Sequence, residues 1–383
     1  MKKISPLIIK ISLFIFTVFV SYSISAISIS ISLLAIGYIF FCISTKRFFY
    51  FDIYKRVLYM MGLFVILLIL STIFSFDISS SIKRTTTILG YFVLFLAMFT
   101  VDNKYAKKLI PIFIIFVCVH SLYGIIQYFT GLDIMNKGYQ KYQRVIGIVG
   151  HFNSLAGILG LVFPVLFCLF YFLKNKIIYG IAMSLVIICT ILTFTRGVWL
   201  GIFVFFLLFC IFFDKKILIF LAMFLIMLFS LPVTRNRVLL TFKRREVVRE
   251  SFLIPTAKLI LKRPILGYGP DSFRKVFYEK NPNFIEKGHF HPHNMYLHIL
   301  FELGFLGMTV FLWLFFEFLR GLLKIYETTD DDFTKYFTLG TVGSIIVFLV
   351  YGFVDEPFRA HFAPYVLFYL TSLSYRLGVL QQK

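Results

Sequence analysis

The sequence predicts an all-α membrane protein that crosses the lipid bilayer about twelve times. Of its 383 residues, 60% are hydrophobic and only 15% are charged, and the mean hydropathy is +0.89. Soluble domains carry about 25% charged residues, so this composition excludes a soluble globular protein. Apolar stretches of span length recur from one end of the chain to the other, as expected when lipid replaces water as the solvent.

The apolar stretches are the predicted transmembrane helices. They cover residues of about 6–23, 25–44, 57–76, 87–101, 109–130, 154–173, 177–195, 197–213, 217–232, 293–319, 336–354 and 362–379. The first two are poorly separated, so eleven spans is the alternative. The first stretch could instead be a signal peptide, but no A-x-A cleavage site follows it, and we expect a retained anchor.

Loop charges predict the orientation. Lys and Arg exceed Asp and Glu by 39 to 18, which in a soluble protein would suggest nucleic-acid binding. Most of these cations lie instead in loops, and one set of short loops holds some of them near residues 46–56, 104–108, 174–176 and 215–216. By the positive-inside rule these loops and both termini are cytoplasmic, and no nucleic-acid partner is expected.

One long connection, residues 233–292, separates the nine predicted spans within residues 1–232 from the three within residues 293–383. It contains thirteen Lys and Arg against five Asp and Glu, and the orientation places it on the outer face. Long loops translocate largely regardless of charge, so its positive charge requires a separate explanation. Either the loop is attracted to anionic lipid headgroups, or it binds a diphosphate and a phosphorylated acceptor.

A histidine cluster lies where this loop meets the next span. It consists of His289, His291, His293 and His298. Histidine is the side chain whose ordinary pKa suits general acid–base chemistry at neutral pH. Pro292 suits the start of a helix, which predicts that His293 lies in its first turn at the membrane surface, one turn before Tyr296.

Two alternatives remain for this cluster. Alternate histidines can chelate a metal, but no Asp or Cys is close in sequence, so no metal site is expected. The histidines could also be amphipathic interface residues.

The five cysteines lie within apolar stretches without C-x-x-C spacing and are predicted to pack in the membrane.

Three ionisable residues stand out beyond the cluster. Glu302 lies roughly 13 Å along its predicted helix, at a depth where it has a function or needs a partner. Arg196 interrupts an apolar hairpin on the basic-poor outer side, which favours anion binding over a snorkelling turn residue. Arg144 precedes the sixth span among glycines that let the backbone approach a ligand, or it is a plain loop residue.

Common catalytic motifs are absent from the sequence. It contains no Walker lysine motif, G-x-S-x-G or H-E-x-x-H. Catalysis with these residues would therefore need no cofactor or metal: arginines would neutralise a diphosphate leaving group while a histidine deprotonates the nucleophile.

Three segments in order resemble the O-antigen ligase superfamily across roughly residues 140–365. They are Thr195-Arg196-Gly197; Arg249 with the Arg263–Phe273 segment, which contains Pro-Ile-Leu-Gly-Tyr-Gly-Pro; and His293-Asn294-Met-Tyr296-Leu297 followed by Glu302-Leu-Gly-Phe-Leu-Gly307. Members are polytopic C-type glycosyltransferases that move a glycan from undecaprenyl diphosphate to a hydroxyl on the periplasmic face of the bacterial inner membrane.

The resemblance implies roles for individual residues. Arg196 matches the hairpin arginine, Arg249 matches a loop arginine that contacts diphosphate, and His293 matches the general base. Asn294, Tyr296 and Glu302 would support the base, and Arg144 is a further candidate diphosphate ligand. The neighbouring His291 and the pair Arg244 and Arg245 depart from the pattern and leave alternatives to His293 and Arg249.

The function expected from this resemblance is that of an O-antigen ligase with a lipid A–core acceptor, surrounded by membrane lipids. A ligase is favoured because the chain is compact and has one large loop late in the sequence. An O-antigen or exopolysaccharide polymerase of the same superfamily is the first alternative. A transporter or lipid flippase is the alternative from another class, but it predicts inverted repeats and midplane charges that the sequence lacks.

Overall fold

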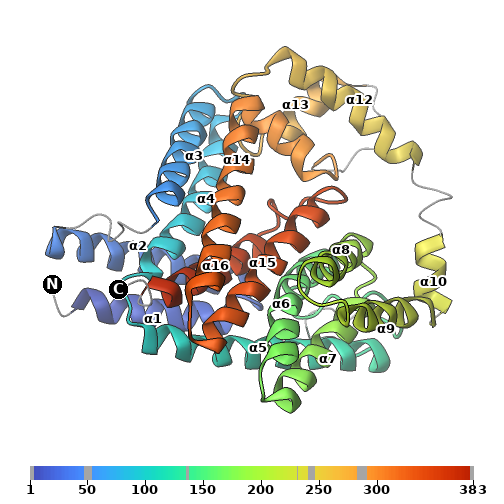
Figure 1. Cartoon of the computed structure of the whole chain (residues 1–383). Helices are drawn as coiled ribbons and strands as arrows, with labels where there is room; N and C mark the ends of the chain where they lie inside the picture. Colours follow the sequence, from blue (N-terminus) through green and yellow to red (C-terminus); the bar gives the residue numbers. More distant parts are fainter. Residues whose placement is uncertain are drawn as a thin grey trace.

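The computed structural model of the chain describes residues 4–46, 54–134, 138–230, 232–239, 246–282 and 291–379, without the side chains of 233, 237–239 and 246–251. Throughout this part the regular structure is helical (Figure 1). Twelve helices overlap the predicted spans: α1 (Ile4–Phe19), α2 (Ile24–Thr45), α3 (Lys55–Ile73), α4 (Ile78–Met98), α5 (Asn103–Thr130), α6 (Phe152–Phe172), α7 (Lys176–Leu192), α8 (Arg196–Phe212), α9 (Ile217–Ser230), α14 (Met295–Thr328), α15 (Asp332–Gly352) and α16 (Phe362–Gly378). The long connection contains α10 (Pro232–Leu239), α12 (Glu246–Lys262) and α13 (Phe273–Lys280).

Six of the described helices are long and apolar enough to cross a membrane. These are α2, α3, α5, α6, α14 and α15, and four shorter apolar helices, α1, α7, α8 and α9, accompany them. The protein is therefore an all-helical, multi-pass membrane protein. The count of about twelve spans stays a prediction.

Helix α6 is the centre of the core. Every residue from Leu155 to Leu169 is buried, and α6 packs against α7, α8, α15 and α16. Gly340 of α15 allows the backbones of α15 and α6 to approach each other closely, because a Cβ there would lie 2.4 Å from the Cα of Val165. Helix α15 is thereby fixed against α6, and the end of α15 carries part of the site described below.

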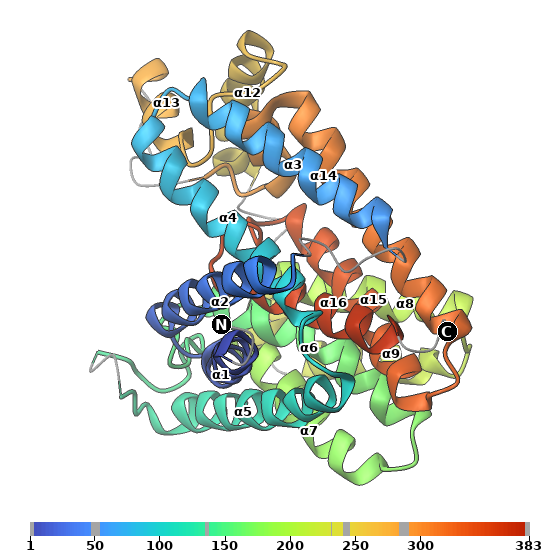
Figure 2. The ribbon, with the colours of Figure 1, turned by 90° about the vertical axis from the view of Figure 1, so that its left-hand side faces the viewer.

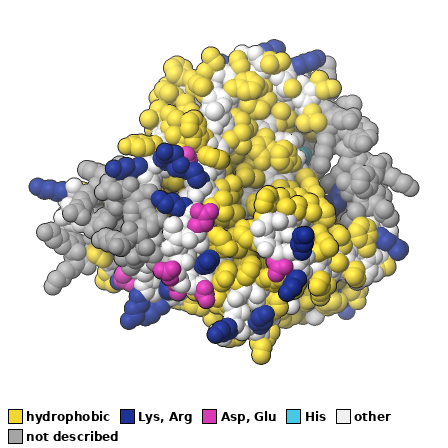
Figure 3. Space-filling view, in the orientation of Figure 1, with side chains coloured by type: hydrophobic (Ala, Val, Ile, Leu, Met, Phe, Trp, Pro, Cys, Tyr) yellow, Lys and Arg dark blue, Asp and Glu magenta, His cyan; other side chains and the backbone are white. Residues whose placement is uncertain are grey.

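Helices α3, α4 and α14 form a second group that runs side by side (Figure 2). The outer faces of α3 and α14 expose large apolar side chains such as Ile66, Ile73, Phe305 and Phe316. Hydrophobic side chains cover the upper part of this face in Figure 3. Exposed apolar surface of this extent is expected of helices that face lipid.

Helix α14 is interrupted at Gly304, whose φ of 66° is left-handed. The turn at residues 264–269 docks against the interruption: Phe305 N donates to Pro264 O at 2.7 Å, and Gly269 N donates to Glu302 O at 2.9 Å. Gly304 makes room for this turn, because a Cβ there would lie 2.3 Å from Ile265 O. The turn satisfies backbone groups that a helix break would otherwise leave unpaired in an apolar environment.

Candidate active site

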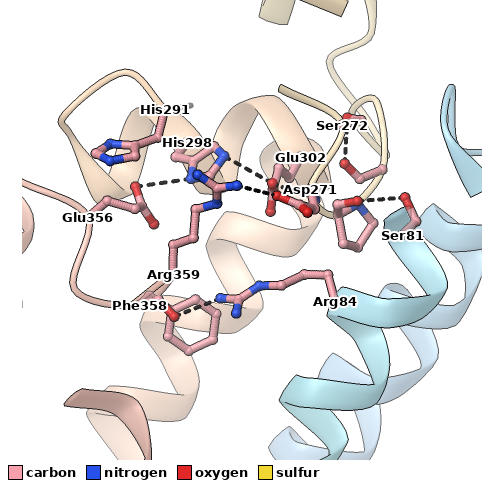
Figure 4. A network of polar contacts seen from close by, with 12 residues as sticks. Ser81, Arg84, Asp271, Ser272, His291, His298, Glu302, Glu356, Phe358 and Arg359 are labelled. Atoms are coloured by element: carbon pink, nitrogen blue, oxygen red, sulfur yellow. Dashed lines mark hydrogen bonds and ion pairs between the residues drawn. The ribbon is translucent and has the colours of Figure 1, made fainter. Parts of the chain in front are cut away.

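A cavity of about 430 Å³ opens between α4, the start of α6 and the segment that joins α15 to α16. Its lining is strongly polar and includes three cations, three histidines and three carboxylates. These are Lys83, Arg84, Arg359, His151, His291, His361, Asp271, Asp355 and Glu356. Figure 4 shows part of this lining, with His291, Asp271, Glu356 and Arg359 gathered on one side of Arg84.

Beside the cavity, His293 pairs with Asp355, which follows the end of α15. His293 Nδ1 lies 3.4 Å from Asp355 Oδ1. The other carboxylate oxygen accepts hydrogen bonds from Asn153 Nδ2 at 2.6 Å and from Tyr351 Oη at 3.1 Å. Burial alone would raise the pKa of Asp355, but the hydrogen bond with His293 and the nearby His291 lower it below its ordinary value. Asp355 is therefore an ionised carboxylate that orients His293.

Of the two neighbouring histidines, His291 and His293, it is His291 that lines the cavity. The Nδ1 atom of His291 accepts a hydrogen bond from His293 N at 3.3 Å. Burial, reinforced by the neighbouring His293, lowers the pKa of His291 to about 3. An imidazole with such a pKa is neutral at physiological pH and is a weak base. The His293 side chain stays 32% exposed beside it.

The prediction that His293 lies in the first helical turn is wrong. Asn294 is the N-cap of α14, and its side chain accepts a hydrogen bond from Leu297 N at 2.9 Å. His293 therefore precedes the helix, with a left-handed φ of 53° that is uncommon outside glycine. Tyr296 donates its hydroxyl to Leu349 O at 2.7 Å. Asn294 and Tyr296 thus fix the helix that follows His293.

Three cations of the lining were not singled out in the sequence. Arg84 is 8% exposed and donates to Phe358 O at 2.7 Å, and Arg359 pairs with Asp271 at 2.6 Å. Among the described carboxylates, none lies within ion-pair distance of Lys83 or Arg84. The polar start of α4 was not predicted to be helical, because Asp77, which caps it by accepting from Ser80 N, is followed by a serine run rather than an apolar stretch.

A second histidine–carboxylate network adjoins the cavity through Glu356, which is also part of the lining (Figure 4). His298 lies 2.9 Å from Glu302 and 3.1 Å from Glu356, and all three side chains are buried. Glu302 also accepts a hydrogen bond from Asp271 N at 2.6 Å. Glu302 therefore has the partner that its depth was expected to require.

Arg144 connects its own loop to the α7–α8 turn. Its guanidinium donates to Thr193 O at 2.8 Å and to Thr195 Oγ1 at 3.1 Å, and it covers the Phe152 ring at 3.2 Å. It also donates to Asn153, the partner of Asp355. Arg144 thus holds the hairpin turn and the start of α6 together.

The other two predicted arginines are not in the lining of this cavity. Arg196 is the half-buried first residue of α8, in the turn that Arg144 fixes. Arg249 belongs to α12, but its side chain, like all of His289, Arg244 and Arg245, lies outside the described residues. Whether Arg249 reaches a diphosphate stays a prediction.

His291, His293 and Asp355 also form a possible metal-ligand set. Their ligand atoms lie within 4.8 Å of one another, and two imidazoles with one carboxylate are donors that suit Zn²⁺. The sequence argument against a metal missed Asp355 because this residue is 62 positions from His293. The expectation of a metal-free site therefore stays a prediction.

The comparison with known proteins agrees with the motifs. Residues 181–312 match the family model described as O-antigen ligase. The match runs from α7 through the long connection into α14 and includes Arg196, Arg249 and His293. It confirms the predicted resemblance to the O-antigen ligase superfamily and supports a membrane enzyme of the ligase or polymerase kind. No curated protein sequence matches the chain.

Proposed function

We propose that this protein is an O-antigen ligase that transfers a polysaccharide from undecaprenyl diphosphate to a hydroxyl of the lipid A–core oligosaccharide. The observation that supports this most is the His293–Asp355 pair beside a cavity lined by Lys83, Arg84 and Arg359. A base next to cations that can contact a diphosphate is the arrangement that transfer from such a donor needs, and of these cations Lys83 and Arg84 have no ion pair with a described carboxylate. The active site would face the periplasm from the bacterial inner membrane.

The proposed reaction is a single inverting displacement. The acceptor oxygen forms a bond to the anomeric carbon while the bond from that carbon to the diphosphate oxygen breaks. His293 takes the hydroxyl proton, and undecaprenyl diphosphate leaves with the bonding electron pair. Asp355 stabilises the imidazolium that forms, and no metal or cofactor takes part.

His293 is favoured over His291 as the base because their surroundings differ. The pKa of His291 is lowered to about 3, so this residue would bind a proton too weakly. The side chain of His293 is more exposed and has an ionised carboxylate at its Nδ1. A carboxylate in that position holds the imidazole ring in one orientation for proton transfer.

The cations supply the stabilisation of the leaving group. Arg84 presents a guanidinium in a largely desolvated position, where charge interactions are stronger than in water. Lys83 is exposed one residue before it, and Arg359 lies on the opposite segment of the lining. We place the donor diphosphate against these residues, with Arg196 and Arg249 as the further contacts that the family motif implies and with Arg144 holding the turn of Arg196.

Deletion of the gene and electrophoresis of the cell's lipopolysaccharide test this proposal. A ligase predicts loss of the O-antigen ladder and accumulation of lipid-linked polymer, both restored by the wild-type gene. A single-repeat band would identify a polymerase instead. An unchanged ladder would contradict both functions.

A further inference from the structure

Helix α12 has two faces of different character. One face packs on the protein: Phe252, Leu259 and Ile260 are buried in a cluster with Phe277 and Phe301. The opposite face is apolar but exposed. Ile254 is 63% exposed, Leu261 is 71% exposed, and Ile265, just beyond the helix, is 62% exposed.

Lysines border this exposed apolar stripe. Ile254 and Leu261 are seven residues apart and therefore share one face, since a helix has 3.6 residues per turn. Lys258 and Lys262 are exposed on one flank of the same face. An apolar stripe with cations along its edge is the pattern of a helix that lies in a membrane interface, with the lysines at headgroup level.

The stripe continues into the apolar surface of the membrane-spanning helices. Arg263, directly after α12, donates to Phe74 O at the end of α3 at 3.3 Å. Pro264 accepts from Phe305 N, and both Phe74 and Phe305 expose more than half of their side-chain surface. Leu261 and Ile265 thus extend the lipid-facing surface of α3 and α14, which Figure 3 shows as a broad hydrophobic area on the upper part of the molecule.

We propose that α12 lies in the surface of the bilayer on the cavity side, with Ile254, Leu261 and Ile265 among the acyl chains and with Lys258 and Lys262 on anionic lipid headgroups. Burial of the stripe in lipid removes from water an apolar area that the protein itself leaves uncovered. The lysines add electrostatic attraction, which grows with the negative charge of the leaflet. This inference holds for any reaction that the cavity performs.

Depth-dependent fluorescence quenching tests the proposal on the full chain in vesicles. The five native cysteines are replaced, and single cysteines at Ile254, Leu261 or Glu279 are labelled with an environment-sensitive nitrobenzoxadiazole dye. Glu279 is the control, because it lies on the exposed polar face of the neighbouring α13. A fourth single cysteine, labelled in the same way at Ile66 on the outer face of α3, is the control for a lipid-facing site.

We expect brominated acyl chains to quench the dye at positions 254 and 261 at least twofold more than at 279, and aqueous iodide to do the reverse. Equal iodide quenching at 254, 261 and 279 would overturn the proposal. A second arm compares vesicles with and without phosphatidylglycerol. The K258Q/K262Q variant should lose the increase in acyl-chain quenching at position 254 that phosphatidylglycerol produces in the parent, and an unchanged increase would contradict the role of the lysines.

Discussion

Two histidine–carboxylate groups lie five residues apart on this chain. Their surroundings suit one of them to proton transfer and the other to a structural role. His298 is 3% exposed and has a carboxylate on each side, at 2.9 and 3.1 Å. His293 is 32% exposed and pairs with one carboxylate at 3.4 Å. A histidine held between two buried acids is fixed in place and screened from substrates. A partly exposed histidine with one orienting acid can bind and release a proton during a reaction.

The largest expected effect comes from His293→Ala. Removal of a positioned general base should lower the turnover number about 10²- to 10⁴-fold, with donor binding and expression nearly unchanged. The transfer rate of purified enzyme with lipid-linked donor and lipid A–core acceptor measures this effect.

His291→Ala is the matched control for this prediction, because His291 contacts His293 but has a pKa of about 3. It should reduce the rate far less. If both variants prove equally inactive, the assignment of a single base is wrong. If neither loses activity, the proposed mechanism fails.

Arg196→Lys should have the second largest effect, a loss of roughly 10²-fold in turnover, similar to removal of one transition-state donor. Arginine presents a planar fork that binds a diphosphate bidentately, whereas lysine offers a point charge, so equal charge will not restore the rate. Lys176→Arg, at the opposite end of α7, is the control and should keep full activity. Wild-type turnover of Arg196→Lys would remove Arg196 from the donor site.

The helical framework was predictable, because apolar stretches of span length follow directly from the hydrophobic effect in lipid. The misplaced start of α4 shows where this signal ends: its first two turns are polar, and a hydropathy pattern passes over them. Lys83 and Arg84 lie in these turns and were therefore missed.

The site was only half predictable for a related reason. His293 was singled out because it belongs to a cluster of four histidines, and Arg196 and Glu302 were singled out because ionisable residues are unusual in apolar surroundings. Asp355 was not, since its role depends on a contact with His293 across 62 residues of sequence. The helix packing that brings α15 to α14 creates this contact, and a single sequence does not reveal such a pairing.

In the second network, Glu302→Gln should affect stability more than chemistry. The substitution removes one of the two carboxylates that face His298 and leaves Glu356 at 3.1 Å as the other, so the cost should be smaller than the about 3–5 kcal/mol that breaking a buried pair completely costs. Thermal unfolding in detergent should show a lower midpoint than for the wild type. Asp332→Asn, at an exposed position at the start of α15, is the control. A turnover number per folded molecule as low as that of His293→Ala would show that the two histidine groups do not differ as described.

The smallest expected effect is that of a chelator. Purified enzyme should keep its transfer rate in excess EDTA, although the ligand atoms of His291, His293 and Asp355 lie within 4.8 Å of one another. These atoms already have protein partners: His291 Nδ1 accepts from His293 N, and Asp355 accepts from Asn153 and Tyr351. A bound ion would also occupy His293, the group that the proposed reaction needs as a base. Loss of activity in EDTA that Zn²⁺ restores would make this cluster a metal site, and His293 would then differ from His298 as a ligand rather than as a base.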